Sequence, residues 1–413
     1  MWKPEARRRH GVTVGVMGLV AVLAGCGSGA DGVATSTSSA ASATSAAASA
    51  SATASASATS AAPSTSNPVA AGCASAIVAS MSLRDKLAAM LVVGVSGTQD
   101  ARRVVDTYHV GGIFVGSFTD FSILADGRLK AIAAQSKRPL MVTVDQEGGR
   151  VSRLSELGID SPSARELVKT STPAQVRRIA AKTGAGLKRL GINVDFAPDA
   201  DVSDESDDEV IGDRSFSDDP AVVARYAGAF ADGLRDAGVM PVFKHFPGHG
   251  HGSGDSHTGT VRTPPLSRLM KSDLVPYRTL LPGRATRAVP TAGVMVGHLI
   301  VPGLTGDELP ASISAPAMRL LRNGTGYGGR PFDGPIFTDD LSGMAAISAR
   351  YGIEEAVVRA LTAGADLALW LSTDKVPDVL AELTSAVRAK RLPQAQVDRS
   401  VARNLRATGA GAC

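Results

Sequence analysis

Eight short apolar runs rich in β-branched residues recur along residues 73–413, and amphipathic stretches with helical periodicity lie between them. The candidate strands are residues 89–95, 110–115, 140–145, 192–197, 239–244, 293–299, 334–338 and 365–371. The clearest helical patterns are residues 173–190, 220–237, 354–363 and 377–390. Continuous apolar strands that alternate with helices indicate a parallel sheet covered on both faces. We therefore expect one α/β domain at residues 73–413, folded as a (β/α)8 barrel of the TIM type, with an open doubly wound sheet as the alternative.

Polar residues at the ends of the candidate strands favour the barrel. Asp145, Asp199, Lys244-His245, His298 and Asp339-Asp340 each follow or end a different apolar run. Barrel enzymes collect their chemistry at the carboxyl ends of their strands. These residues are therefore candidates for one shared site.

The first 25 residues have the pattern of a secretion signal. Arg7, Arg8 and Arg9 form a cationic start, and an apolar segment too short to span a bilayer follows at residues 11–22. Residues 23–26, Leu-Ala-Gly-Cys, resemble the bacterial lipobox, which implies cleavage before Cys26, acylation of that cysteine and a protein held on the outer face of the cytoplasmic membrane. An ordinary secretory signal with a chance cysteine is the alternative.

Residues 26–72 predict a disordered tether. From residue 27 to residue 67 the chain is almost wholly Ser, Ala, Thr and Gly, and Asp31 is the only charged residue. Such a composition buries too little apolar surface to offset the entropy of ordering.

The net charge argues against a nucleic-acid partner. The chain has a formal charge of +4, but Lys3, Arg7, Arg8 and Arg9 against Glu5 supply three of those charges, so the remainder after residue 25 carries only +1. A weakly charged domain lacks the basic surface that nucleic acids require. We expect uncharged or mixed-charge ligands, no cofactor and a monomer.

Two cysteines remain after Cys26, at Cys73 and Cys413. Outside the cytoplasm they can pair and tie the two ends of the domain together. Free thiols at both ends are the alternative.

The loop at residues 244–257, Lys-His-Phe-Pro-Gly-His-Gly-His-Gly-Ser-Gly-Asp-Ser-His, has the composition of a mobile segment that carries an acid. Asp255 lies two residues before His257 and can orient its imidazole for general-acid work. A metal cluster of the loop histidines is an alternative.

Only one carboxylate of Asp339-Asp340 can face the barrel axis, because neighbouring strand residues point to opposite sides. Both could also be helix caps. A loop acid that faces a fixed carboxylate suits double-displacement glycoside cleavage.

Four motifs, in order, resemble the β-N-acetylhexosaminidases of glycoside hydrolase family 3 over about residues 75–390. They are residues 145–151 (Asp-Gln-Glu-Gly-Gly-Arg-Val), 211–216 (Ile-Gly-Asp-Arg-Ser-Phe), 244–250 with 255–257, and 338–342 (Thr-Asp-Asp-Leu-Ser). The resemblance implies a single barrel that needs no second domain for its acid. It also implies a retaining exo-enzyme that releases GlcNAc from β-linked glycans, with GlcNAc-MurNAc fragments of peptidoglycan as natural substrates.

The resemblance also assigns roles to residues. It implies Asp339 as the nucleophile, His257 as the general acid/base and Asp255 as the residue that orients His257. Asp145, Arg153, Arg214, Lys244 and His245 match positions that hold the sugar, although Arg214 and Asp213 could instead form a supporting salt bridge.

Residues 199–209 depart from the family pattern, because this connection is longer and more acidic, and we expect a solvated loop there. A saccharide-binding lipoprotein without catalysis, a β-glucosidase, and a phosphorylase that uses phosphate in place of water remain as alternative functions.

Overall fold

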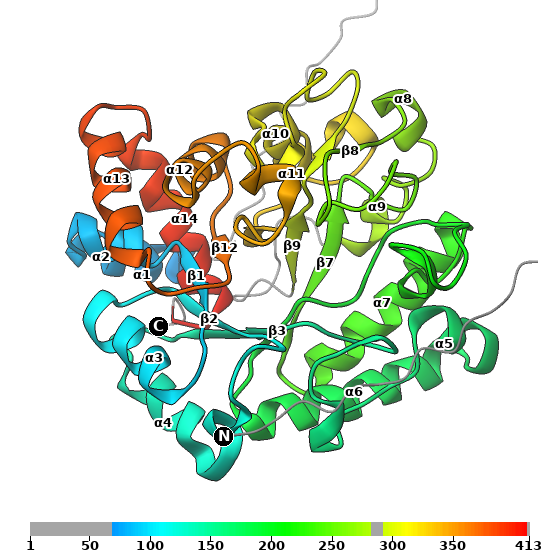
Figure 1. Cartoon of the computed structure of the whole chain (residues 1–413), viewed down its shortest axis with the longest axis horizontal. Helices are drawn as coiled ribbons and strands as arrows, with labels where there is room; N and C mark the ends of the chain where they lie inside the picture. The colour runs from blue at the N-terminus through cyan, green and yellow to red at the C-terminus, as the bar shows by residue number, and fades with distance from the viewer. Residues whose placement is uncertain (1–67, 282–291, 411–413) are drawn as a thin grey trace, which may run out of the picture. The chain divides into compact units, whose positions relative to one another are not determined.

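The computed structural model describes residues 68–281 and 292–410, and within them eight parallel strands form one sheet (Figure 1). The strands run in the order β11-β9-β7-β6-β3-β2-β1-β12. Their bounds are β1 Leu91–Gly94, β2 Gly112–Val115, β3 Met141–Val144, β6 Val194–Asp195, β7 Met240–Phe246, β9 Gly293–Val296, β11 Ile336–Thr338 and β12 Ala368–Trp370. Each strand follows its neighbour in parallel register, as in Val93 opposite Trp370 and Phe337 opposite Met295.

The sheet closes on itself between β11 and β12. Phe337 and Leu367 form a parallel bridge, and the Thr338 N–H donates to the Leu367 carbonyl at 3.0 Å. The expected TIM-type barrel is therefore confirmed, and the open sheet is wrong.

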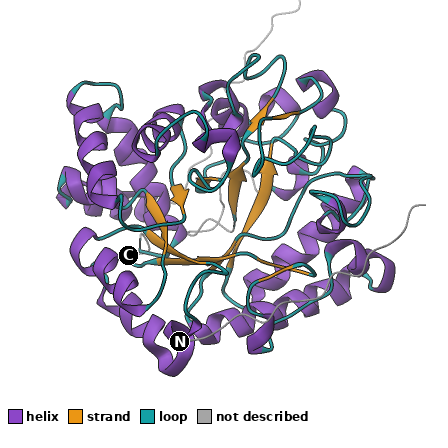
Figure 2. Cartoon of the chain, viewed as in Figure 1, coloured by secondary structure: helices purple, strands orange, loops and turns teal. Residues whose placement is uncertain are grey.

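The helices surround the strands (Figure 2). The α-helices are α1 Pro68–Ser80, α2 Leu83–Ala88, α3 Thr98–Arg103, α4 Arg128–Gln135, α5 Ala164–Thr170, α6 Pro173–Leu190, α7 Pro220–Asp236, α8 Leu266–Leu269, α9 Tyr277–Leu280, α10 Ala315–Asn323, α11 Ala345–Ser348, α12 Ile353–Ala363, α13 Val376–Arg388 and α14 Gln394–Ala407. Short strands outside the barrel are β4 Gln146–Gly148, β5 Val151–Ser152, β8 Val261–Arg262 and β10 Leu299–Ile300. None of the helices in the described ranges is both long and apolar enough to cross a membrane.

Local sequence signals set the bounds of the long helices. Thr172 and Gln175 form a capping box at the start of α6, where Pro173 takes the first turn, and Gly191 ends the helix at a φ of 93°. Asp219 caps α7, which also begins with a proline. The helices predicted at residues 173–190, 220–237, 354–363 and 377–390 are present to within two residues at either end.

Successive side chains of a strand point to opposite faces of the sheet, so the apolar side chains form two clusters. The larger cluster packs the outward side chains against the helices. The smaller one fills the barrel and consists of Val92, Phe114, Met141, Val194, Phe196, Val242, Met295, Phe337, Leu367 and Leu369. The eight predicted strands are all found, each shorter or shifted by a few residues. The bounds differ because the apolar runs in the sequence extend beyond the residues that are hydrogen-bonded in the sheet.

Several expectations fall on residues outside the described ranges: the signal peptide at residues 1–25, Cys26, most of the tether, and Cys413. Helix α1 includes the last residues of the stretch predicted as tether. Cys73, on α1, is disulfide-bonded. Helix α1 packs on α14, near the end of the domain, which is the proximity that a bond to Cys413 requires, and that pairing stays a prediction.

Candidate active site

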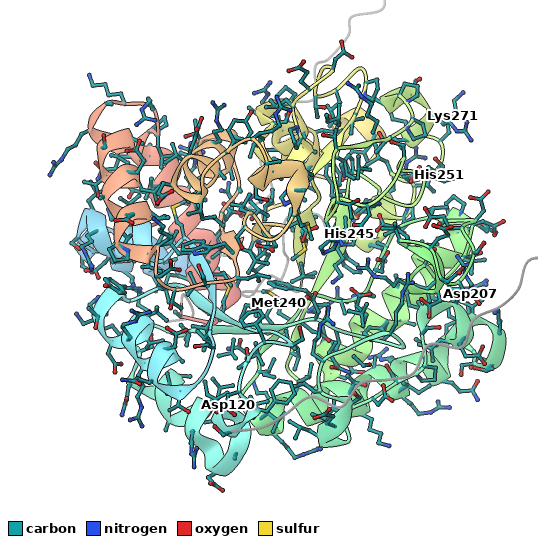
Figure 3. All side chains as sticks on the ribbon, in the orientation of Figure 1. Asp120, Asp207, Met240, His245, His251 and Lys271 are labelled. Carbon is teal, nitrogen blue, oxygen red and sulfur yellow. The ribbon has the colours of Figure 1, made fainter. Side chains whose placement is uncertain are left out.

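The carboxyl ends of β3, β7, β9 and β11 bring polar residues to one mouth of the barrel. Asp145 follows β3, Lys244 and His245 lie on β7, His298 follows β9 and Asp339 follows β11. His245 lies near the centre of the view, whereas Asp120, Asp207 and Lys271 lie toward its periphery (Figure 3). The predicted gathering of strand-end residues is confirmed for this set.

A buried carboxylate, Glu147, lies between two cations at this mouth. Its Oε1 is 2.6 Å from Lys244 Nζ, and Arg214 contacts both carboxylate oxygens, with Nε at 2.8 Å from Oε2 and Nη2 at 2.9 Å from Oε1. Lys244 Nζ also lies 2.6 Å from Asp145 Oδ1. Burial alone would raise the pKa of Glu147, but the charges of Arg214 and Lys244 outweigh it and lower the pKa well below its usual value. Glu147, Arg214 and Lys244 are thus charged at neutral pH.

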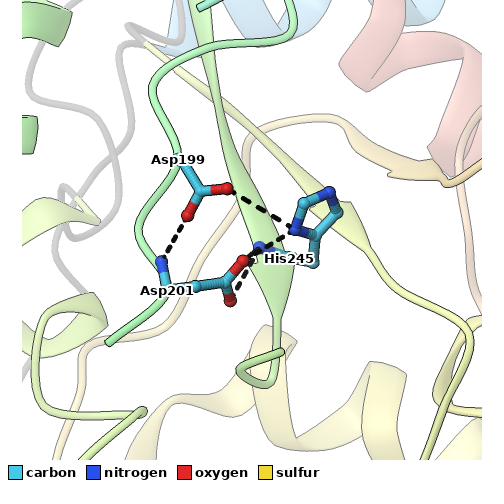
Figure 4. Close-up of side chains that lie close together, drawn as sticks. All are labelled: Asp199, Asp201 and His245. Atoms are coloured by element: carbon cyan, nitrogen blue, oxygen red, sulfur yellow. Dashed lines mark hydrogen bonds and ion pairs between the residues drawn. The ribbon is translucent and has the colours of Figure 1, made fainter. Parts of the chain in front are cut away.

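A second cluster, Asp199, Asp201 and His245, continues the first (Figure 4). His245 Nδ1 lies 2.7 Å from Asp201 Oδ2, and the other oxygen of Asp201 accepts from the His249 N–H at 2.7 Å. Burial and the negative charge of Asp201 raise the pKa of Asp199, whereas the charge of His245 holds the pKa of Asp201 down in spite of burial. Asp201 therefore orients His245 through Nδ1, which leaves Nε2 to face the barrel mouth.

The loop histidines do not converge on a metal centre. His251 Nδ1 bonds Asp273 at 3.0 Å and His257 Nδ1 bonds Asp255 at 2.8 Å, so each has a carboxylate partner other than Asp201, the partner of His245. In the described ranges, the group whose atoms lie close enough for a shared ion is instead Asp199, Asp201 and His245, within 4.8 Å of one another. Two of these three groups, Asp201 and His245, are hydrogen-bonded to each other.

The two adjacent aspartates after β11 point to opposite sides, as the alternation predicts. Asp339 Oδ2 lies 3.9 Å from His245 Nε2, while the Asp340 carboxylate accepts from Ser342 N and Oγ at 2.8 and 2.7 Å and from Gly343 N at 2.8 Å. Burial alone would raise the pKa of Asp339, but the imidazoles of His245 and His298 and the Asp340 N–H outweigh it and lower the pKa. Asp339 is therefore an ionised carboxylate at the mouth, and Asp340 shapes the turn behind it.

The loop after β7 is fixed over its first half. The His249 N–H is bonded to Asp201, the Gly252 N–H donates to the His249 carbonyl at 2.7 Å, and the Ser253 N–H donates to the Arg262 carbonyl at 2.8 Å. These bonds tie the base of the loop to the buried carboxylate of Asp201 and to the strand β8. The movement expected of this loop stays a prediction. The exposed residues begin at Ser253.

The tip of this loop contacts the segment that follows Asp339-Asp340. The Ala345 N–H donates to the His257 carbonyl at 3.3 Å, and the Ala346 N–H donates to the Ser256 carbonyl at 3.1 Å. The His257 side chain is 62% exposed, and its Nδ1 faces Asp255, so Nε2 is the nitrogen left for a substrate. These bonds hold the predicted acid beside the loop that bears the predicted nucleophile.

The other predicted residues are placed as follows. Arg214 pairs with Glu147, and Asp213 pairs with Arg150 at 3.0 Å, so the alternative of an Arg214–Asp213 salt bridge is wrong. Arg153 is half-buried directly after β5, on the same connection as Glu147. The acidic connection at residues 199–209 is not a wholly solvated loop, because Asp199 and Asp201 are buried in the site and Glu205 accepts from two backbone N–H groups at its end.

Sequence reasoning missed Glu147 and Asp201 as site residues. Glu147 stands inside the Asp-Gln-Glu-Gly motif, and Asp201 lies two residues beyond a strand-end aspartate. An acidic residue two positions from another on an apolar strand end shares its face, which is the signal that could have found both.

We expect Glu147→Gln to lower the free energy of unfolding at neutral pH by about 3 kcal/mol, because it leaves Lys244 and Arg214 with one carboxylate fewer. The pKa of Glu147 is lowered in the folded state, so its stabilisation is present above the pKa of the unfolded chain and is lost as the pH falls below about 4. Urea unfolding at pH 7 and at pH 3, within the range where the stabilisation is being lost, measures the difference. Glu156→Gln, an exposed change on the same connection, should shift stability by less than about 0.5 kcal/mol at either pH; an equally stable Glu147→Gln protein would contradict the account.

The chain is similar to known proteins of one family. The family described as glycosyl hydrolase family 3 N terminal domain matches residues 82–407. The β-hexosaminidase LpqI of Mycobacterium tuberculosis is 60% identical over 339 residues, which cover 81% of this chain and 86% of that protein.

Solved structures of related proteins have the same fold. The structure of M. tuberculosis LpqI has a TM-score of 0.77 at 60% identity and covers 80% of this chain and 95% of its own. A glycosyl hydrolase of the same family from Mycobacterium smegmatis has a TM-score of 0.77 at 57% identity, covering 80% and 98%. A family 3 β-N-acetylglucosaminidase from Paenibacillus sp. has a TM-score of 0.70 at 34% identity, covering 81% and 64%. The chain is therefore a glycoside hydrolase and belongs to glycosyl hydrolase family 3, among the β-N-acetylhexosaminidases of that family.

Proposed function

We propose that the protein is a retaining exo-β-N-acetylglucosaminidase that releases GlcNAc from the non-reducing end of β-linked glycans through a glycosyl-enzyme on Asp339. The observation that carries this proposal is the contrast between the two aspartates after β11. The Asp340 carboxylate is engaged by three donors of its own turn, whereas Asp339 faces His245 at the mouth with its pKa lowered. A nucleophilic carboxylate must be ionised and accessible to the substrate.

In the first step, a carboxylate oxygen of Asp339 attacks the anomeric carbon as the glycosidic C–O bond breaks. Nε2 of His257 gives its proton to the leaving oxygen, so the aglycone departs as an alcohol. In the second step, His257 takes a proton from water, and the water oxygen displaces Asp339 from the anomeric carbon. Two displacements at one carbon retain its configuration.

Asp255 supports both roles of His257. The Asp255 carboxylate bonds His257 Nδ1 at 2.8 Å and also accepts the His257 backbone N–H at 2.9 Å. The first bond fixes the tautomer with the proton on Nδ1, or stabilises the imidazolium when Nε2 is also protonated. Asp255 is thus a positioning residue for the acid.

The charged cluster supplies the groups that hold the terminal sugar. Asp145 is partly exposed at the mouth and can accept two sugar hydroxyls. Lys244, which pairs with Asp145, and Arg214, which pairs with Glu147, are cationic donors that can form charge-assisted hydrogen bonds with sugar oxygens. Arg153, half-buried directly after β5, is the further cation proposed to contact the sugar. This arrangement favours a ring fixed at its non-reducing end, as exo-cleavage requires.

We propose GlcNAc-MurNAc fragments of peptidoglycan as the natural substrates and the outer face of the cytoplasmic membrane as the location. The support is the cationic and apolar leader, the Leu-Ala-Gly-Cys sequence at residues 23–26 and the tether, which together would hold the enzyme beside the cell wall.

We expect Asp339→Asn to lower kcat/KM for β-linked GlcNAc substrates by a factor on the order of 10⁴ or more, because the change removes the nucleophile. His257→Ala should lower kcat/KM by about 10² to 10⁴, and by less on an aryl glycoside whose leaving group needs no proton. Steady-state kinetics on GlcNAc-MurNAc and on an aryl β-GlcNAc measure both losses.

Asp340→Asn is the matched control for the nucleophile. It changes the same functional group one residue away and can still accept the hydrogen bonds of Ser342 through its amide oxygen. We expect its kcat/KM to fall by less than about tenfold, since it touches no reacting atom. If Asp340→Asn abolished turnover and Asp339→Asn did not, the assignment of the nucleophile would be reversed.

We expect Cys26→Ser to abolish lipid attachment, since only the thiol can carry the thioether, and to shift the protein from the membrane fraction to the soluble fraction. Cell fractionation and the intact mass of the protein test this in the full chain. Unchanged membrane association of the variant, with an unchanged mass increment, would show that Cys26 is not the anchor.

A further inference from the structure

Two glycines mark one sector of the barrel mouth. Gly94 ends β1 and Gly116 follows β2, and both occupy inward positions, because Val92 and Phe114 two residues earlier belong to the cluster inside the barrel. A Cβ at Gly94 would lie 2.8 Å from Phe118 Cζ and 2.7 Å from Leu371 Cα, and a Cβ at Gly116 would collide with the ring of Phe118. The ring of Phe118 therefore lies across the inward sides of both strand ends.

This ring is exposed although its backbone is fixed. Phe118 is 44% exposed, one of two large apolar side chains above a third exposed in the described ranges, with Leu157. The buried Thr119 hydroxyl beside it accepts from the Gly116 N–H at 3.0 Å and donates to the Val95 carbonyl at 2.7 Å, and the Asp120 N–H donates to the Ser96 carbonyl at 2.8 Å. The fold thus holds an aromatic face toward solvent at the mouth.

The ring faces the sector that the charged clusters leave open. Asp145, Lys244 and Asp339 line the arc from β3 to β11, whereas the inward strand-end positions of β12, β1 and β2 are Leu371, Gly94 and Gly116. Aromatic contacts lead from this sector to the strand of Asp339: Phe118 lies 6.4 Å from Phe114, Phe114 lies 5.9 Å from Phe196, and Phe196 lies 5.2 Å from Phe337, all between ring centroids. Phe337 is two residues before Asp339.

Beyond the ring, the connections after β1 and β2 form a polar hollow of about 640 Å³. Its lining includes Ser96, Thr98, Asp100, Arg103, Asp120 and Arg128. Asp120 lines this hollow and follows Phe118 by two residues, so donors and acceptors for hydroxyl, amide and carboxylate groups lie on the connection that carries the ring.

We propose that Phe118 is the stacking platform for the second sugar of the substrate, the ring that leaves as the aglycone. This inference rests on the proposed function, since it places the aglycone of the same reaction. The axial C–H groups of a β-linked pyranose present an apolar face, and a fixed, half-exposed aromatic ring is the surface that such a face covers. Phe118 then selects glycans with a second sugar over glycosides with a small aglycone.

The test compares GlcNAc-β-1,4-GlcNAc with methyl β-GlcNAc, two substrates with alkoxide leaving groups that differ in the second ring. Phe118→Ala should lower kcat/KM for the disaccharide on the order of tenfold while the value for the methyl glycoside changes by less than about twofold. Phe118→Tyr should keep the wild-type ratio of the two values. Gly116→Ala should lower the ratio with the phenylalanine still present, because its methyl group displaces the ring.

Leu157→Ala is the matched control, since Leu157 is equally exposed on the connection after β3, and its ratio should stay at the wild-type value. An equal loss on both substrates in Phe118→Ala, or no loss on either, would overturn the platform. A wild-type protein that cleaves neither substrate would overturn the proposed function instead. The platform would then be judged by calorimetric binding of the uncleaved disaccharide, which Phe118→Ala should weaken about tenfold and Phe118→Tyr should preserve.

Discussion

The ion cluster around Glu147 is the constraint on which the rest of the site depends. Glu147 comes from the connection after β3, Lys244 from β7 and Arg214 from the connection after β6, so the cluster joins three separate parts of the barrel mouth. Each of these charged groups is removed from water, and each is stable in the interior only because opposite charges are buried beside it. Lys244 also contacts Asp145, and Arg214 lies 3.6 Å from Asp199, which links the cluster around Glu147 to the cluster of His245.

A second series of contacts connects Asp201, His245 and Asp339. Asp201 fixes His245 by its Nδ1, and Nε2 then faces the Asp339 carboxylate. Asp201 also holds the base of the loop that carries Asp255 and His257, through the His249 N–H. One buried carboxylate, Asp201, therefore contacts both the histidine that faces Asp339 and the base of the loop that carries His257. Through these contacts it connects the proposed nucleophile with the loop of the proposed acid.

The fold could be predicted from the sequence to a large extent, and the site only in part. The eight apolar runs and the caps at Thr172 and Asp219 carry local signals, and the barrel follows from their alternation. The opposite orientations of Asp339 and Asp340 also followed from strand alternation. The pairing of Arg214 with Glu147 in place of its neighbour Asp213 did not, because it depends on how the connections after β3 and β6 fold over the mouth. The same holds for the base of the loop after β7, because the hydrogen bond between the His249 N–H and Asp201 joins segments that are far apart in the sequence.

The central claim is that Asp339 becomes covalently bound to the sugar. A substrate whose sugar leaves the enzyme slowly, such as a 5-fluoro derivative of an activated β-GlcNAc glycoside, should make the glycosyl-enzyme accumulate. Mass spectrometry of proteolytic fragments then locates the bound sugar. The account predicts a single added GlcNAc-type mass on the fragment that contains Asp339, absent from the Asp339→Asn protein. Continued turnover of the slow substrate with the label on another residue, or with no labelled fragment at all, would contradict it.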